Sequence, residues 1–87
     1  MYFVYILYSN KIDKYYIGST DNIPGRLRRH NQGNKSFTST GKPWMLVYKE
    51  VFNTKTEALK RESQLKNWKN RERIESLISK DLEHPDK

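Results

Sequence analysis

A glutamate stands on the apolar side of a helix that the sequence predicts in the second half of the chain. At 100° per residue, Glu62 projects between Ala58, Leu59 and Leu65, the residues expected to face the core. An unpaired carboxylate is costly to bury, so Glu62 must meet a cation. That cation is either a basic side chain, such as an arginine of a neighbouring helix, or a metal ion, and the pattern leaves both open.

A histidine and an arginine lie four residues apart on an earlier predicted helix. His30 falls at the edge of the apolar stripe, between the directions of Ile23 and Arg26, so imidazole and guanidinium lie side by side. Arginine can hold phosphate oxygens in a fork while imidazole accepts or relays a proton. The pair therefore suits a phosphodiester, and it also fits a solvated basic helix face that continues through Arg28 and Arg29.

Two tyrosines fall on strands that the sequence predicts to pair. If Tyr5 lies opposite Gly18 and Leu7 opposite Tyr16, both phenols share one face of the sheet, with an empty position beside Tyr5. The result is a cleft lined by phenols. Tyrosines in a small β-rich domain also serve as ordinary core and surface residues, so these two carry little meaning alone.

The first half of the chain must supply the elements that position these residues. Residues 2–8 are all aromatic or aliphatic and lead through a turn-forming stretch into a second extended run over 14–19, which indicates an antiparallel hairpin. A helix follows, with Thr20 or Asp21 as its N-cap, and ends near Asn31. The next segment, 32–42, is rich in Gly, Asn, Ser, Thr and Lys and suits phosphate contacts from an irregular loop.

The second half adds one strand and two helices. Residues 44–52 predict a third strand, and Thr54 with Glu57 forms a capping box that opens the next helix. A last helix is expected over about 71–82, and the acidic end 81–87 should fray. The residues expected to face the core are Ala58, Leu59, Leu65 and Trp68 in the first of these helices, and Ile74, Leu77 and Ile78 in the second.

The totals restrict the class of protein. With 87 residues there is room for one domain, which we expect over 1–80. The chain has no cysteine and only two histidines, which excludes disulfides and a structural zinc site. No apolar run approaches the roughly 18 residues of a membrane span and no secretion signal is visible, so we expect a cytoplasmic protein. Neither a Walker A loop nor a local signature of a Ser, His and Asp triad is present.

The charge points to a polyanionic partner. Seventeen Lys and Arg against ten Asp and Glu give a formal charge of +7, with a pI near 9.7. Such surfaces attract phosphate backbones through Coulomb steering and counterion release.

Together, these residues carry a resemblance to a known family. Tyr5, the run Tyr16-Ile17-Gly18, the pair of Arg26 and His30, and Glu62 resemble the GIY-YIG endonuclease superfamily, over nearly the whole chain. The chain looks like the small stand-alone bacterial members. The YIG half of the family signature is intact as Tyr16-Ile17-Gly18. The GIY half reads Phe3-Val4-Tyr5 here and keeps only the tyrosine.

The resemblance implies a fold and a chemistry. The fold would be α+β, a three-stranded antiparallel sheet flanked by three helices in the order ββαβαα. The activity would be divalent-metal-dependent hydrolysis of DNA phosphodiester bonds, with repair or recombination as a candidate setting. Tyr5 would help to activate the attacking water with His30 and Tyr16, Arg26 would stabilise the phosphorane, and Glu62 would hold Mg²⁺ or Mn²⁺.

Further residues enter in supporting roles. Gly18 would support the motif, and an asparagine that many members carry after the metal-binding helix has only Asn67 and Asn70 as loose counterparts here. Lys42 stands before a proline where an arginine is usual, which keeps a phosphate contact and loses its bidentate geometry. The residues expected to contact nucleic acid are Lys14, Arg28, Arg29, Lys35 and Lys42.

Two other functions stay open at this level. The charge and the altered first motif also fit a nucleic-acid-binding module with weak or silent catalytic machinery. An interaction domain that uses its basic surface only for solubility is the third reading. Steeply salt-dependent binding without cleavage would identify the second, and absence of binding at low salt the third.

Overall fold

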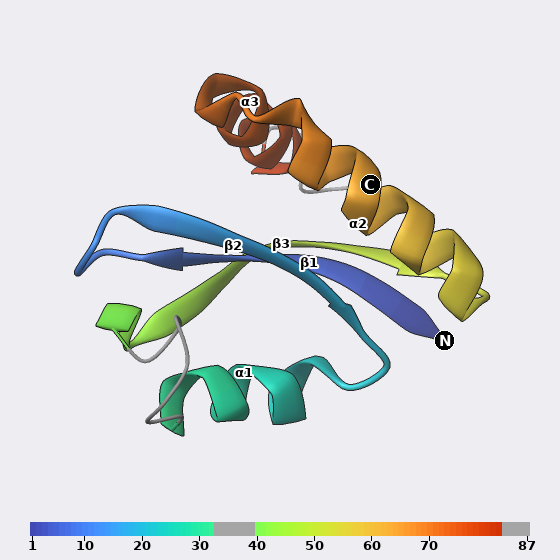
Figure 1. The fold of residues 1–87 in the computed structure, drawn as a ribbon, viewed down its shortest axis with the longest axis horizontal. Coiled ribbons are helices and arrows are strands. Elements are labelled where there is room, and N and C mark those ends of the chain that lie inside the picture. Colours follow the sequence, from blue (N-terminus) through green and yellow to red (C-terminus); the bar gives the residue numbers. More distant parts are fainter. Residues whose placement is uncertain (33–39, 83–87) are drawn as a thin grey trace.

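Three antiparallel strands form a sheet in which the first strand is central. The computed structural model describes residues 1–32 and 40–82, and the strand order is β2-β1-β3. The order of elements, ββαβαα, and the three-stranded antiparallel sheet confirm the fold expected from the sequence (Figure 1). The elements are β1 (Tyr2–Ser9), β2 (Lys14–Thr20), α1 (Ile23–Gln32), β3 (Trp44–Phe52), α2 (Lys55–Trp68) and α3 (Arg71–Leu82).

The register between β1 and β2 is the one that the sequence predicts. Tyr5 pairs with Gly18 and Leu7 with Tyr16. Because side chains alternate between faces along a strand, this register puts both tyrosines on one face of the sheet. The pairing of β1 with β3 has a register shift between Ile6 and Leu7. On the two sides of this shift, the side chains of β3 therefore match those of β1 differently in which face of the sheet they point to.

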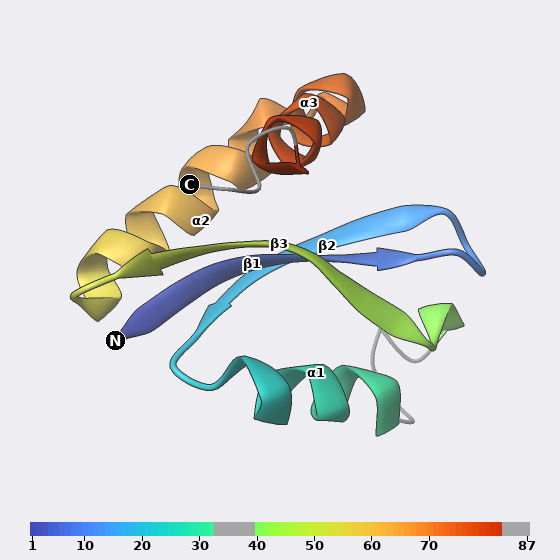
Figure 2. The ribbon, with the colours of Figure 1, turned by 180° about the vertical axis from the view of Figure 1, so that it is seen from behind.

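Helices cover both faces of the sheet, which explains why β1 is apolar throughout. Helix α1 lies against one face, and α2 and α3 lie against the other, as the two opposite views show (Figures 1 and 2). On the α1 side, Tyr5 and Leu7 pack with Trp44 and Ile23. On the α2 side, Val4 packs with two helix residues that the sequence places on the apolar stripe, Ala58 and Leu65. A strand buried on both faces needs a continuous apolar run, and β1 has one.

The helix starts agree with the sequence except at α1. Thr54 and Glu57 form the predicted capping box, with both reciprocal hydrogen bonds. The N-cap of α1 is Asn22, not Thr20 or Asp21, because Asn22 Oδ1 accepts from the Gly25 amide at 3.1 Å. Thr20 is still part of β2, where it pairs with Phe3, so the strand ends later than the N-cap expectation requires.

One predicted core residue is exposed. Leu59 has 47% of its surface open to solvent, whereas Ala58 and Leu65 are fully buried. Seven residues make nearly two whole turns, so Ala58 and Leu65 set the direction of the core, and Leu59 points about 100° away from it. In α3, Ile74 is buried while Leu77 and Ile78 are half-buried.

Parts of the sequence-based expectation lie outside the described residues. Residues 33–39 of the predicted loop, with Lys35 among them, are not described. Helix α3 extends to Leu82, and the rest of the expected tail also lies outside. Among the described helices, none is both long enough and apolar enough to cross a bilayer.

Candidate active site

Tyr5, Tyr16 and His30 form a ring cluster between the sheet and α1. The Tyr5 hydroxyl lies 3.1 Å from His30 Nε2. The His30 ring meets Tyr16 edge-on with ring centroids 4.6 Å apart, and the Tyr5 and Tyr16 rings are 6.4 Å apart. Tyr5 is 1% exposed and His30 8%. His30 is therefore more deeply buried than its place at the edge of the apolar stripe suggests, because its ring is covered by both tyrosines.

Gly18 makes room for the Tyr5 phenol on the edge strand. A Cβ atom at this position would lie 2.6 Å from Tyr5 Oη and 3.2 Å from Tyr16 Cε1. The phenol thus occupies the space that any other residue would fill, as expected from the register. Gly18 is needed here for a close approach, since its backbone is ordinary β-strand.

Burial controls the protonation of this cluster. Desolvation raises the pKa of Tyr5 to about 12, with further upward contributions from Tyr16 and Glu62 that the charge of Arg26 opposes. Desolvation also lowers the pKa of His30 below its ordinary 6.5, and the nearby Arg26 and Arg29 lower it further. At neutral pH the phenol is therefore protonated and the imidazole is neutral.

Arg26 stands next to this cluster and lines a small pocket. Its charge acts on both Tyr5 and His30. The pocket has a volume of about 200 Å³. Its lining is formed by Tyr2, Ser19, Thr20, Asp21, Arg26 and Lys55. Two cations, Arg26 and Lys55, against one carboxylate, Asp21, leave this pocket with one net positive charge, which suits a phosphate.

Glu62 reaches the site from the opposite face of the sheet. Its Oε1 accepts a hydrogen bond from Ser19 Oγ at 2.6 Å, and its Oε2 lies 2.7 Å from the Lys66 ammonium. Ser19 pairs with Val4, whose side chain faces α2, while its neighbour Gly18 pairs with Tyr5 on the α1 face. The two halves of the site therefore meet around the free edge of β2, where two consecutive residues serve opposite faces.

Sequence reasoning missed both partners of Glu62. The basic side chain at Glu62 is Lys66, one turn further along the same helix, and not an arginine of a neighbouring helix. The spacing of four residues was a signal for this pair. Ser19 carried no signal in the chain itself, because its contact spans 43 positions and depends on how α2 crosses the sheet.

The surroundings of Glu62 fit a divalent cation bound through one carboxylate. In the described part of the chain, no three His, Cys, Asp or Glu side chains gather as a metal cage. Mg²⁺ is commonly bound by one or two carboxylates, with waters and substrate phosphates completing the shell. The Glu62 side chain is 18% exposed, Ser19 orients it, and an ammonium group already lies at Oε2. Lys66 is 51% exposed and can withdraw into solvent.

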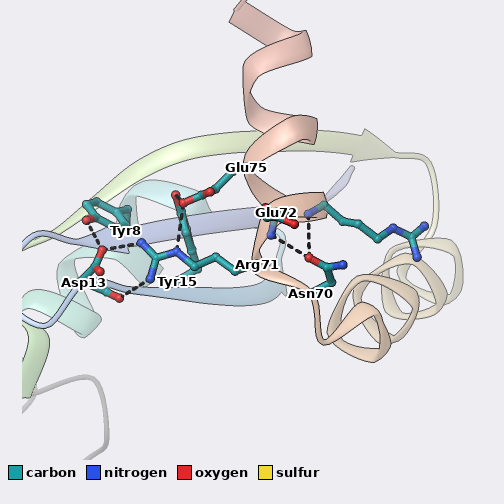
Figure 3. Close-up of polar contacts among 8 residues, drawn as sticks. Tyr8, Asp13, Tyr15, Asn70, Arg71, Glu72 and Glu75 are labelled. Carbon is teal, nitrogen blue, oxygen red and sulfur yellow. Dashed lines mark hydrogen bonds and ion pairs between the residues drawn. The ribbon is translucent and has the colours of Figure 1, made fainter.

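The remaining expected contacts lie mostly on the surface. Lys14, Arg28 and Arg29 are exposed, and Lys42 is half-buried. Asn67 is exposed on α2, and Asn70 caps α3 through a hydrogen bond from the Glu72 amide to its Oδ1 at 2.9 Å (Figure 3). Asn70 therefore has a structural role of its own, outside the ring cluster.

Comparisons with known proteins identify the family. A UPF0213 protein of Staphylococcus haemolyticus is 34% identical over 77 residues, which cover 87% of this chain and 93% of the relative. A UPF0213 protein of Staphylococcus saprophyticus is 37% identical over 79 residues, which cover 90% and 94%. The solution NMR structure of the UPF0213 protein BH0048 from Bacillus halodurans aligns with a TM-score of 0.57 and 31% identity, over 91% of this chain and 84% of that one. The family model described as the GIY-YIG catalytic domain matches residues 1–75, and the chain therefore belongs to the GIY-YIG family of nuclease domains.

Proposed function

We propose that this protein is a divalent-metal-dependent endonuclease that hydrolyses DNA phosphodiester bonds. The observation that carries the proposal is the hydrogen bond between the buried Tyr5 hydroxyl and His30 Nε2, beside Arg26 and within the electrostatic influence of Glu62. Tyr5, Tyr16, Arg26 and His30 are the proposed catalytic residues, and Glu62 is the proposed metal ligand.

The protonation states of Tyr5 and His30 support a proton relay through Tyr5. A phenol with a pKa of about 12 is too rarely ionised at neutral pH to act as a free base. With the imidazole proton on Nδ1, His30 Nε2 can accept the Tyr5 proton while the Tyr5 oxygen takes a proton from water. The resulting hydroxide attacks phosphorus, the P–O3′ bond breaks, and the departing oxygen leaves with the shared electron pair. The departing 3′ oxygen takes a proton from solvent, and His30 returns its own proton to solvent after the reaction.

Positive charge near Tyr5 supports the binding of the phosphate. Arg26 can donate two parallel hydrogen bonds to the phosphate oxygens and stabilise the added negative charge of the phosphorane. Tyr16 holds the His30 ring edge-on and fixes its direction toward Tyr5. A divalent ion at Glu62 would supply Lewis-acid stabilisation to the departing 3′ oxygen.

Cleavage assays with two site variants test the proposal. Purified protein is incubated with supercoiled plasmid and labelled oligonucleotides in Mg²⁺ or Mn²⁺, and nicking is followed over time. Glu62→Gln and Tyr5→Phe should each lose activity by about 100-fold or more, because each removes a group that acts in the reaction. Glu72→Gln on α3 is the matched control and should keep wild-type activity. Equal activity of wild type and Glu62→Gln would overturn the assignment.

One observation favours a nucleic-acid-binding module without turnover. Both Glu62 oxygens already have partners, Ser19 and Lys66, so a metal ion must compete with an ammonium group. If the Lys66 ammonium stays bound to Glu62 at physiological Mg²⁺ concentration, the protein binds DNA and does not cleave it. Mn²⁺ titration followed by electron paramagnetic resonance distinguishes the two functions, because a nuclease requires saturable Mn²⁺ binding that Glu62→Gln abolishes.

A further inference from the structure

A groove runs along the free edge of β2, on the side of Glu62. It has a volume of about 400 Å³ and lies between β2 and the junction of α2 with α3. Four consecutive strand residues, Lys14 to Ile17, form one wall, and the helix junction from Lys69 to Arg71 forms the other. Lys66 also lines the groove and is ion-paired to Glu62, so one lining residue contacts the proposed metal ligand.

The groove has an excess of positive charge. Its lining contains four cations, Lys14, Lys66, Lys69 and Arg71, against one carboxylate, Asp13. Arg71 is committed to Asp13 and to Glu75. In the described part of the chain, neither Lys14 nor Lys69 has an ion-pair partner within 4.0 Å. Two ammonium groups therefore stand available to a ligand that carries negative charge.

A network of side chains fixes the far wall. Arg71 donates to the Asp13 carbonyl and carboxylate and to Glu75, while Tyr8 donates to Asp13 and Tyr15 to Glu75 (Figure 3). The Arg71 guanidinium also lies 5.2 Å from the centre of the Tyr15 ring. The tip of the β1–β2 hairpin is thereby tied to the start of α3, and the groove keeps its shape without a ligand.

Lys69 occupies a backbone position where its side chain is not favoured. It caps the C-terminus of α2 with φ 49° and ψ 27°, in the left-handed region. Glycine is the usual residue there, because a Cβ atom is strained in this conformation. The chain thus keeps a lysine at a site where glycine would favour folding, and that lysine lines the groove.

We propose that this groove along β2 holds the phosphodiester backbone of the nucleic-acid strand on one side of the scissile phosphate. Lys14 and Lys69 contact its phosphates. When a metal ion binds Glu62, Lys66 leaves that carboxylate and contacts the strand instead. The occupant is a nucleic-acid strand because the free charges are cationic and Lys66, which lines the groove, is ion-paired to the proposed metal ligand Glu62. This assignment rests on the proposed nuclease function and adds to it the path of the substrate.

The first test measures DNA binding by groove variants in the Glu62→Gln background, where cleavage does not interfere. The variant Lys14→Ala/Lys69→Gly is compared with Lys49→Ala/Lys60→Ala, which removes the same charge from β3, the opposite edge of the sheet, and from α2 outside the groove. Fluorescence anisotropy with a labelled oligonucleotide gives the dissociation constant across a salt series.

The two pairs should behave differently. Because each phosphate contact contributes about 0.7–0.9 to the slope of log K against log salt, the groove pair should lower the slope by roughly 1.4–1.8. Its affinity near 0.1 M salt should fall by on the order of tenfold or more. The control pair should change affinity by less than about twofold. Lys69→Gly should not lower the melting temperature, so weaker binding is separated from unfolding. Equal losses in both pairs would overturn the groove assignment.

The second test locates the strand directly. Since the chain has no cysteine, a single introduced one is unique. Lys69→Cys and the control Lys60→Cys are each labelled with a photoactivatable cross-linker and irradiated with the oligonucleotide. Cross-links should form at position 69 and be at least several-fold fewer at position 60. Equal or stronger cross-linking at position 60 contradicts the proposal.

Failure of the groove and failure of the nuclease are distinguishable. If Glu62→Gln abolishes cleavage but the groove pair binds DNA like its control, the nuclease assignment is supported and the proposed path of the strand is wrong. If Glu62→Gln cleaves like wild type while the groove pair alone loses binding, the groove stands as a binding site and the nuclease assignment is wrong.

Discussion

Replacing Gly18 by alanine should displace the Tyr5 phenol. The added Cβ would lie 2.6 Å from Tyr5 Oη and 2.8 Å from Tyr5 Cζ, against about 3.4 Å for an ordinary contact. The overlap with the oxygen is therefore roughly 0.8 Å. Tyr5 is 1% exposed and its ring is rigid, so it cannot turn into solvent to relieve the overlap.

The magnitude follows from three contributions. Overpacking in a well-filled core costs about 1–3 kcal/mol. Loss of the Tyr5–His30 hydrogen bond adds about 1 kcal/mol. The lower entropy of the unfolded chain with alanine offsets about 0.4–1 kcal/mol. The free energy of unfolding should thus fall by about 2 kcal/mol, which lowers the melting temperature of a domain of this size by roughly 8–16 °C.

Thermal and urea unfolding followed by circular dichroism measure this effect. Gly25→Ala is the comparison variant: its Cβ would meet the Asn22 side chain, whose Oδ1 caps α1, so its cost should be limited to the loss of that cap, about 1 kcal/mol. In a double-mutant cycle, Tyr5→Leu removes both overlapping atoms, so Gly18→Ala should cost less in that background, by about 1–2 kcal/mol. A Gly18→Ala protein that melts with the wild type and keeps full nuclease activity would refute the close packing of Tyr5 on Gly18.

Three further predictions follow from the same contacts. Because the folded state lowers the pKa of His30, the unfolded state binds more protons below pH 6.5. The free energy of unfolding should therefore be constant above pH 6.5 and decline as the pH falls below it. Urea midpoints measured across this range should decline less in His30→Gln than in the wild type. The difference in phenolate absorbance between wild type and Tyr5→Phe should titrate at about 12; a midpoint near 10 would mean that the phenol is solvated. Arg61→Met should lower the free energy of unfolding by about 1–3 kcal/mol, because it leaves the half-buried Glu50 without its bidentate partner, whereas Lys60→Met should be neutral; equal urea midpoints would contradict this.

The sequence alone determined the order of the elements and the pairing of β1 with β2. The two-residue period of a strand excludes odd shifts of the pairing, and the turn-forming residues at 9–13 set the length of the hairpin loop, which together place Tyr5 against Gly18. The proximity of Arg26 to His30 and the capping box at Thr54 are equally local, because helix geometry alone brings residues three or four apart together.

Only the tertiary structure decided how the two halves of the site meet. Helical spacing places Glu62 near the apolar stripe, but its contact with Ser19 depends on where α2 crosses the edge strand. That crossing depends on the order of the strands in the sheet, which no local sequence pattern predicts. The groove with Lys14 and Lys69 has the same origin, since it joins the start of β2 to the end of α2. Local periodicity gives the direction of a side chain, whereas the identity of its neighbour depends on long-range packing, and that packing brings Tyr5 and Glu62 around the free edge of β2.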